Sequence, residues 1–371
     1  MPKPLRAYLE AQADRVEMVL SAQKAPGRVT GGTVGPRIVR FFLEPEPDVR
    51  YERLRRLDED LAIALRVSNL RIDRSEKGVV LEFEHPNPRP VSLLKLLPQV
   101  IVDEHGNPDP LPDTTALLGL TEDGIPLLAR LASARVAPVL VAGMTGSGKS
   151  VLLRSAALSL LMTHEADKLR MICMDPNGKT FTPFKGAPHL LRPQITDPPA
   201  AVDALRSLSH AVKSRRQRGE TRPYVVVVID NLGDLIYAGG DEIAEMLVRL
   251  IQHGQEVGIY PIVATQRPSS ASMVELVQTH FALRLVGKVG SANDARMASG
   301  RGGTDAHLLN GRGDFLAIGG GEGEPLRFQV ASVGEAEIRQ EIAKLQNPTT
   351  SNSFMEPEPV IIDVAPARVR R

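Results

Sequence analysis

The segment GMTGSGKS, residues 143 to 150, has the residue types and the spacing of a phosphate-binding loop. The apolar run VLVA precedes it and the helical run VLLRSAALSLL follows it, a context that a plain glycine-rich turn lacks. Glycines let backbone N–H groups curl around an anion, and the start of the following helix adds its positive end. The predicted nucleotide-binding residues are Gly143, Met144, Thr145, Gly146, Ser147, Gly148, Lys149 and Ser150.

Two side chains of this loop would contact the nucleotide and its metal. Lys149 is expected to reach the β and γ phosphates of ATP, and Ser150 to place its hydroxyl on Mg²⁺. Outside the loop, the run YVVVVI leads to Asp230, whose carboxylate would hold the same Mg²⁺ opposite Ser150. The sequence therefore predicts ATP and Mg²⁺ as cofactors, with Ser150 and Asp230 as the metal-binding residues.

Two amides complete the predicted catalytic set, which is Lys149, Asp230, Asn231 and Gln266. Gln266 follows the apolar run PIVAT, where its amide could sense the γ-phosphate; a polar residue that merely begins a loop is the alternative. Asn231 follows Asp230 directly, where an ATP-driven motor normally carries a glutamate that activates water. An asparagine can hydrogen-bond that water but cannot take its proton. We therefore expect nucleotide binding together with reduced hydrolysis.

Short apolar strands that alternate with amphipathic helices must position these residues. The strands that we expect are VLVA, MICM, YVVVVI, PIVAT, FALRLV and DFLAI. Their alternation with helical segments over residues 116–345 predicts an α/β domain with a doubly wound, mostly parallel sheet.

The rest of the chain is predicted to form four further segments. Residues 1–28 show helical spacing, and residues 29–98 combine strands and a helix into a small α+β domain. Residues 99–115 are rich in Pro and Asp without periodicity and are expected to be a linker. Residues 346–371 contain prolines and no periodicity, which predicts a disordered tail, with a docking peptide as the alternative.

The composition is that of a globular protein: 371 residues, 42% hydrophobic and 24% charged. The sequence has no apolar run long enough to cross a bilayer and no signal peptide, so we expect a cytoplasmic protein without a membrane span. The single cysteine, Cys173, lies in an apolar run and is expected in the core. With a net charge of +1 and only 4% aromatic residues, nucleic-acid contact requires a local basic patch and not base stacking.

One basic run is a candidate for contact with double-stranded DNA. It ends the predicted helix that opens after Asp197 and closes at Gly219, and its candidate residues are Lys213, Arg215, Arg216 and Arg218. Lys and Arg directed at the phosphate backbone are what binding to a duplex needs. The alternative is that basic residues in a last helical turn are favoured by the helix dipole alone.

The order of these motifs resembles the FtsK/SpoIIIE family of hexameric DNA translocases over roughly residues 29–345. The resemblance rests on LVAGMTGSGKSV, MICMDPNGKT, VVVVIDNLGDLI, VGIYPIVATQRPS and LLNGRGDFLAI. It implies a RecA-like P-loop NTPase motor preceded by a small α-type domain, and a homo-hexamer that surrounds double-stranded DNA and pulls it with ATP. The membrane anchor and the winged-helix domain of the large relatives are not recognised in the sequence.

Two positions depart from the family pattern. Asn231 replaces the acid of an Asp-Glu pair, although Asp234 retains the later acid of the motif. Gln255 aligns with an arginine that reaches the phosphate of a neighbouring subunit in relatives, a contact worth roughly 10³–10⁵ in rate. The arginines that could substitute for it are Arg249, Arg296, Arg301 and Arg312.

Three functions remain open from the sequence. The first is an ATP-dependent translocase of duplex DNA with slow or rearranged catalysis. The second is a nucleotide-binding ring or adaptor that does not hydrolyse ATP, and the third is an ATPase that couples ATP to plasmid or protein transfer. DNA-stimulated phosphate release separates the first from the second, and co-purification with membrane or secretion components would indicate the third.

Overall fold

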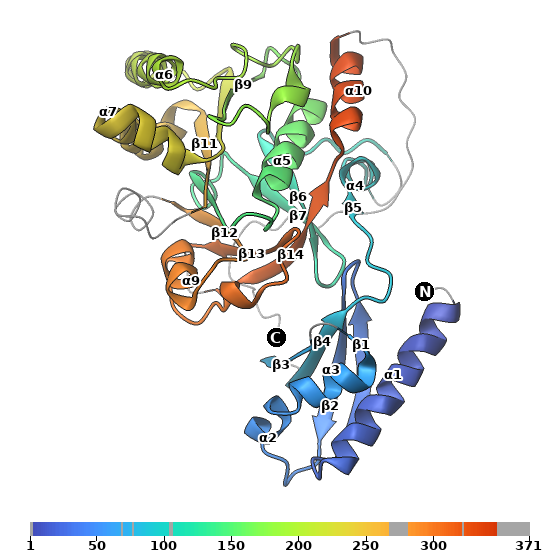
Figure 1. The fold of residues 1–371 in the computed structure, drawn as a ribbon. Helices are drawn as coiled ribbons and strands as arrows, with labels where there is room; N and C mark the ends of the chain where they lie inside the picture. Colours follow the sequence, from blue (N-terminus) through green and yellow to red (C-terminus); the bar gives the residue numbers. More distant parts are fainter. Residues whose placement is uncertain are drawn as a thin grey trace, which may run out of the picture. The chain divides into compact units, whose positions relative to one another are not determined.

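The computed structural model describes residues 3–67, 70–75, 78–103, 107–266, 281–320 and 323–346. The chain divides into two compact units at Pro90, and the turn Glu122–Gly124 belongs to the first unit (Figure 1). This division differs from the predicted one in two places. The N-terminal helix is part of the small unit, and residues 91–103 are part of the large one. The predicted tail beyond Gln346 lies outside the described residues.

The small unit is an antiparallel sheet in the order β1-β2-β4-β3, with helices on one face. Its elements are α1 (Lys3–Ala22), β1 (Gly27–Val34), β2 (Ile38–Pro45), α2 (Tyr51–Arg55), α3 (Asp58–Leu65), β3 (Leu70–Ser75) and β4 (Gly78–Glu84). Alternate residues of β2, such as Phe41, pack against Val16 of α1 and Leu61 of α3 in one apolar core. The edge strand β1 was not predicted because its side chains are mostly exposed and show no apolar alternation.

The large unit contains a mixed sheet in the order β7-β6-β14-β13-β12-β8-β11-β10-β9. The parallel strands are β12 (Leu283–Gly287), β8 (Val139–Ala142), β11 (Ile259–Thr265), β10 (Tyr224–Ile229) and β9 (Leu169–Met174). The antiparallel strands are β13 (Asp314–Gly319), β14 (Leu326–Ser332), β6 (Thr115–Thr121) and β7 (Pro126–Arg130), while the short β5 (Val91–Ser92) runs parallel to β14.

The α/β class and the six predicted strands are thus confirmed, but the mostly parallel sheet is not. Strands joined by short connections, as in the β6–β7 and β13–β14 pairs, must run antiparallel. Strands that are covered on both faces carry few polar residues, and every residue of β8 and of β11 is buried. The parallel strands therefore appear in the sequence as short apolar runs.

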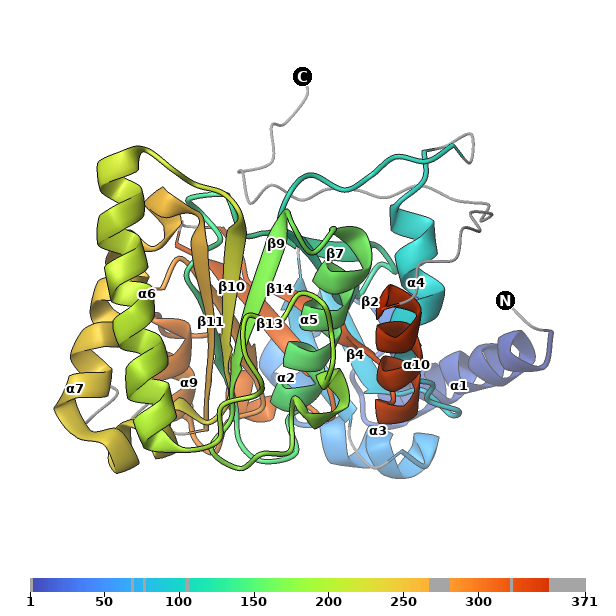
Figure 2. The ribbon, with the colours of Figure 1, turned by 90° about the horizontal axis from the view of Figure 1, so that it is seen from above.

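Helices cover both faces of this sheet (Figure 2). On one side lie α4 (Leu93–Val100), α5 (Lys149–Thr163) and α10 (Glu335–Gln346), and on the other lie α6 (Pro198–Arg218), α7 (Leu232–His253) and α9 (Ala292–Ser299). Among the described residues there are also short 3₁₀ turns, namely η1 (Thr182–Phe184), η2 (Gln255–Val257) and η3 (Ala306–Leu308). In the described part of the chain, no helix combines the length and the apolar character needed to span a bilayer.

Candidate functional site

The predicted site residues meet at one edge of the parallel half of the sheet. Strands β8 and β10 both pair with β11 in parallel, so their carboxyl ends lie side by side. The phosphate-binding loop follows β8, Asp230 follows β10 and Gln266 follows β11. Residues as far as 121 positions apart in the chain, Thr145 and Gln266, are in contact there. This is the edge at which open α/β sheets bind ligands.

Backbone hydrogen bonds from two other loops hold the phosphate-binding loop in place. The Met144 N–H donates to the carbonyl oxygen of Lys288 at 2.7 Å, just beyond β12. The N–H groups of Arg312 and Gly313 donate to the carbonyl oxygens of Gly146 and Ser147 at 3.0 and 2.7 Å. The GRGDF segment thus supports the loop from outside through its main chain.

Gly148 is required by both its conformation and its neighbours. Its φ is +110°, and a Cβ at this position would lie 2.7 Å from the nitrogen of Gly313. The supporting segment is itself fixed, because Arg327 forms two contacts of 2.9 Å with the carboxylate of Asp314. A side chain at position 148 would therefore displace either the loop or its support.

Lys149 begins α5, and its ammonium is held inside the loop. Its Nζ donates to the carbonyl oxygens of Gly143 at 2.7 Å and Met144 at 3.1 Å. The residue is buried, and this burial lowers the pKa of the ammonium, while the nearby Asp230 carboxylate acts in the opposite direction. The first N–H groups of a helix have no partner within it, so the start of α5 offers further donors to an anion.

The Asp230 carboxylate is surrounded by three donors. The hydroxyls of Ser150 and Thr180 each donate to Oδ2 at 2.7 Å, and the Asn231 N–H donates to Oδ1 at 2.9 Å. Asp230 and Thr180 are buried. A hydroxyl that points its hydrogen at Oδ2 leaves its lone pairs free on the other side.

The oxygen atoms of Ser150 and Asp230 fit Mg²⁺. In proteins this ion is bound by oxygen ligands, which commonly are one or two carboxylates, several waters and the phosphates of a nucleotide. Within the described ranges, no group of three or more His, Cys, Asp or Glu residues could hold a metal by itself. The residues present therefore suit a metal that arrives with a nucleotide and not a permanent structural ion.

Gln266 and Asn231 belong to a hydrogen-bonded chain across the edge of the sheet. The Thr145 hydroxyl donates to Gln266 Oε1 at 2.9 Å, and Gln266 Nε2 donates to Asn231 Oδ1 at 2.6 Å. Asn231 has a left-handed backbone with φ 54° and ψ 49°, a conformation that asparagine adopts more readily than most residues. The chain links all three loops of the site.

Two features of the site were missed by the sequence-based prediction. Thr180 is an ordinary residue in the segment MDPNGKT, and only the fold brings it to Asp230. The support from residues 311–313 is made by backbone atoms, which leave no side-chain signature apart from the glycines. Gly311 and Gly313 both have a positive φ, which favours glycine. These two glycines are therefore the sequence feature that goes with this support.

The basic residues at the end of α6 are largely paired within the chain. The predicted helix is confirmed, with Asp197 as its N-cap and Gly219 as its C-cap. Arg215 donates to the carbonyl oxygen of Val257 at 3.0 Å, and Lys213 is exposed. Arg216 lies 3.5 Å from Glu256, and Arg218 lies 3.0 Å from Glu220. Two of the four basic side chains are thus paired with glutamates, which reduces the positive charge of this helix end. DNA contact at the end of α6 stays a prediction.

Gln255, the position aligned with the arginine of relatives, lies in η2 after α7. Among the possible substitutes, Arg249 pairs with Glu245 at 3.5 Å and Arg301 donates to the carbonyl oxygen of Gly323 at 2.7 Å. Arg296 donates to the side chain of Asn293 at 3.3 Å. Arg312 has an exposed side chain on a backbone that is bonded to the phosphate-binding loop.

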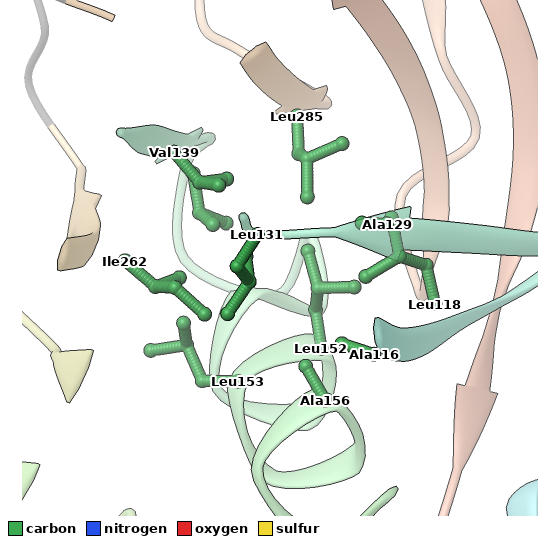
Figure 3. A pocket seen from close by; sticks show the side chains of 11 residues that line it. Ala116, Leu118, Ala129, Leu131, Val139, Leu152, Leu153, Ala156, Ile262 and Leu285 are labelled. Atoms are coloured by element: carbon green, nitrogen blue, oxygen red, sulfur yellow. The ribbon is translucent and has the colours of Figure 1, made fainter. Parts of the chain in front are cut away.

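An apolar cavity lies beside α5 on the side of the sheet that faces this helix (Figure 3). It is lined by side chains such as Leu131, Leu152, Leu153 and Ile262 from several strands and from α5. None of the lining side chains is polar, so the cavity offers nothing to hold a phosphate or a metal. The cavity is a gap in the core. The candidate site is instead at the edge of the sheet where the parallel strands end.

Comparison with known proteins identifies two family models in this chain. The model of the FtsK/SpoIIIE family matches residues 112–218 and 207–270, and that of the FtsK alpha domain matches residues 3–87. DNA translocase SftA of Bacillus subtilis is 28% identical over 96% of this chain and 39% of its own length. DNA translocase FtsK of Sporosarcina ureae is 30% identical over 89% of this chain and 45% of its own length. The chain thus spans less than half the length of these relatives.

Two solved structures show the same fold at lower identity. The pCW3 conjugation coupling protein TcpA, in a monomer form with ATPγS, has a TM-score of 0.57 and 18% identity and covers 91% of this chain and 100% of its own. The type VII secretion ATPase EccC of Thermomonospora curvata has a TM-score of 0.57 and 24% identity and covers 76% of this chain and 36% of its own.

Proposed function

The chain belongs to the FtsK/SpoIIIE family, and we propose that it is an ATP-binding motor that moves double-stranded DNA, with reduced hydrolysis. The proposal includes a ring of six copies around the duplex, working in the cytoplasm where ATP is available. The relatives named DNA translocases support the choice of DNA as the partner.

The observation that carries this proposal is the convergence of three loops on one edge of the sheet. Lys149, Ser150 and Asp230 lie there with the chemistry that binds a nucleotide and its metal, and Gln266 joins them from the end of β11. Asp230 and Gln266 follow β10 and β11, so they would connect bound phosphates to these two neighbouring strands. The arrangement favours ATP as the ligand, as in the conjugation protein that was solved with ATPγS.

Each residue of the site has a distinct role in this proposal. Lys149 exchanges its contacts with the carbonyl oxygens of the loop for contacts with the β and γ phosphates. Ser150 and Asp230 hold Mg²⁺, which when bound supplies positive charge to the phosphates during transfer. Gln266 reports the presence of the γ-phosphate to β11.

Asn231 is the residue that slows ATP hydrolysis in this proposal. It stands beside Asp230, and its carboxamide cannot accept a proton from the attacking water. Loss of a general base removes roughly 10²–10⁴ in rate. The contacts of Lys149, of the Ser150 hydroxyl and of the Asp230 carboxylate do not involve this side chain, so nucleotide affinity is retained while turnover is slow.

The test is a phosphate-release assay with and without duplex DNA, together with nucleotide binding. Wild type should bind Mg-ATP and release phosphate faster with DNA, and Lys149→Ala should lose both. Lys168→Ala is the matched control, because Lys168 is an exposed lysine that pairs with Glu165 at 2.9 Å. Binding of ATP without any DNA-stimulated release would instead indicate a ring that does not hydrolyse, and equal nucleotide affinity in Lys149→Ala and wild type would contradict the proposed site.

A further inference from the structure

Thr180 lies at the centre of the candidate site, although it belongs to neither the phosphate-binding loop nor the segment around Asp230. Its hydroxyl donates to Asp230 Oδ2 at 2.7 Å, the same distance at which the Ser150 hydroxyl donates to the same oxygen. Thr180 is buried, with 5% of its surface exposed. Two hydroxyls from separate loops therefore share one carboxylate oxygen.

The loop that carries Thr180 is built around a second buried carboxylate. Asp175, which follows β9, is fully buried and accepts the N–H groups of Lys179 and Thr180 on one oxygen, each at 2.8 Å. Its other oxygen accepts the N–H of Asn177 at 2.9 Å. Since Asp175 binds the backbone of Thr180 directly, the loop fixes where the Thr180 hydroxyl lies.

The loop is also anchored on its far side. The aromatic rings of Phe181 and Phe184 are buried in the core and lie 6.1 Å apart between centroids. The N–H of Asp175 donates to the carbonyl oxygen of Ile195 at 2.9 Å. Thr180 is thus presented to Asp230 by a segment that is held at both ends.

We propose that Thr180 is a positioning residue of the metal-nucleotide site, which holds the Asp230 carboxylate in the orientation that Mg²⁺ requires. This inference rests on the proposed function. Thr180 supplies a second donor to Asp230 Oδ2 from the β9 side, so the carboxylate is held from two separate segments of the chain. The Thr180 hydroxyl keeps its lone pairs on the side away from Asp230, where they can accept a hydrogen bond from a water bound to the metal.

The experiment measures nucleotide affinity by fluorescence of a labelled ADP while free Mg²⁺ is varied, and it does not need turnover. Thr180→Val removes the hydroxyl at nearly constant size, and Thr180→Ser keeps it. Thr182→Val is the matched control, because the Thr182 hydroxyl lies in the same segment and donates to the carbonyl oxygen of Gly178 at 2.5 Å, away from Asp230.

In Thr180→Val, the Mg²⁺ concentration at half-maximal affinity should rise by roughly tenfold, the effect of one hydrogen bond to a charged group. Affinity measured in excess EDTA should stay unchanged, and Thr180→Ser and Thr182→Val should behave as wild type. If Thr180→Val does not fold, Thr180→Ala removes the same donor from a smaller side chain.

Several outcomes would overturn the inference. A Mg²⁺ dependence in Thr180→Val equal to that of wild type would show that the hydroxyl does not position Asp230. An equal rise in Thr180→Ser or in Thr182→Val would assign the effect to the loop as a whole. Absence of nucleotide binding by wild type at any Mg²⁺ concentration would overturn the proposed function itself, and this inference with it.

Discussion

The side-chain amide of Gln266 donates a hydrogen bond of 2.6 Å to the side-chain oxygen of Asn231. The contact joins the ends of β11 and β10, and Thr145 extends it to the phosphate-binding loop through a bond of 2.9 Å to Gln266. The side-chain oxygen of Asn231 is thus the acceptor for the Gln266 amide, and the side-chain N–H groups of Asn231 are what it can offer to a phosphate or a water. We propose that this chain of contacts responds to a bound nucleotide.

Gln266→Leu should uncouple nucleotide binding from turnover. The substitution removes both bonds of the amide but leaves Lys149, Ser150 and Asp230 in place. Affinity for Mg-ATP should stay within about threefold of wild type, and DNA-stimulated turnover should fall by at least about tenfold, a cautious figure for the loss of a polar group that contacts the reacting phosphate. Gln217→Leu, on the exposed end of α6, is the control. Parallel losses of affinity and turnover in Gln266→Leu would argue against a sensing role.

Gly148→Ala should disrupt the phosphate-binding loop. The new Cβ would lie 2.7 Å from the Gly313 nitrogen, and φ of +110° is unfavourable for alanine. We expect nucleotide affinity to fall by more than about tenfold and the unfolding temperature to fall. Gly124→Ala is the control, because Gly124 also has a positive φ but no atom lies within 4 Å of the place that its Cβ would take. Gly124→Ala therefore measures the effect of backbone strain alone, which costs about 1–2 kcal/mol. Equal effects of the two substitutions would refute the role of the Gly313 contact.

Acid should destabilise the large unit through His164. Its Nε2 accepts the N–H of Thr114 at 2.9 Å, so the ring must be neutral there, and burial lowers the pKa of His164. When the pKa of a histidine is lower in the folded than in the unfolded state, its protonation does not affect the free energy of unfolding above about pH 6.5. Below that value the unfolded state binds the proton more readily, so the folded state loses stability. The unfolding temperature should therefore drop between about pH 7.5 and pH 5.5, by roughly a few degrees more in wild type than in His164→Gln. The same drop in both proteins would show that His164 is not the group responsible.

Binding to duplex DNA should depend on salt and on assembly. The net charge of one chain is only +1, so contacts from several copies must add up to hold the backbone. Affinity should fall by about tenfold for every two phosphates contacted when salt rises from about 50 to 200 mM. Measurement by fluorescence anisotropy beside analytical ultracentrifugation would check both points. A monomer that holds duplex DNA with an affinity insensitive to salt would contradict the ring.

The parts of the fold and site that could be predicted are those with local signals. The segment GMTGSGKS and the apolar run before Asp230 were recognisable because strands, loop and helix follow each other within a few residues. The hairpin of β6 and β7 was missed, although its turn at Asp123-Gly124 is a known signal. Thr180 could not be found in this way, because its contact with Asp230 joins residues far apart in sequence and threonine has no distinguishing pattern. The support of the loop by Gly313 is likewise a long-range backbone contact.

We propose that Asn231 limits the turnover of a site whose phosphate-binding parts are in place. The most direct measurement is DNA-stimulated phosphate release by wild type and Asn231→Glu, with Mg-ATP affinity measured on the same preparations. We expect equal affinity and at least about a tenfold higher rate for Asn231→Glu, a value below the usual effect of a catalytic base. Adding Gln255→Arg should raise the rate further if that position faces a neighbouring subunit. An Asn231→Glu protein that folds, binds Mg-ATP and hydrolyses it no faster than wild type would contradict the claim.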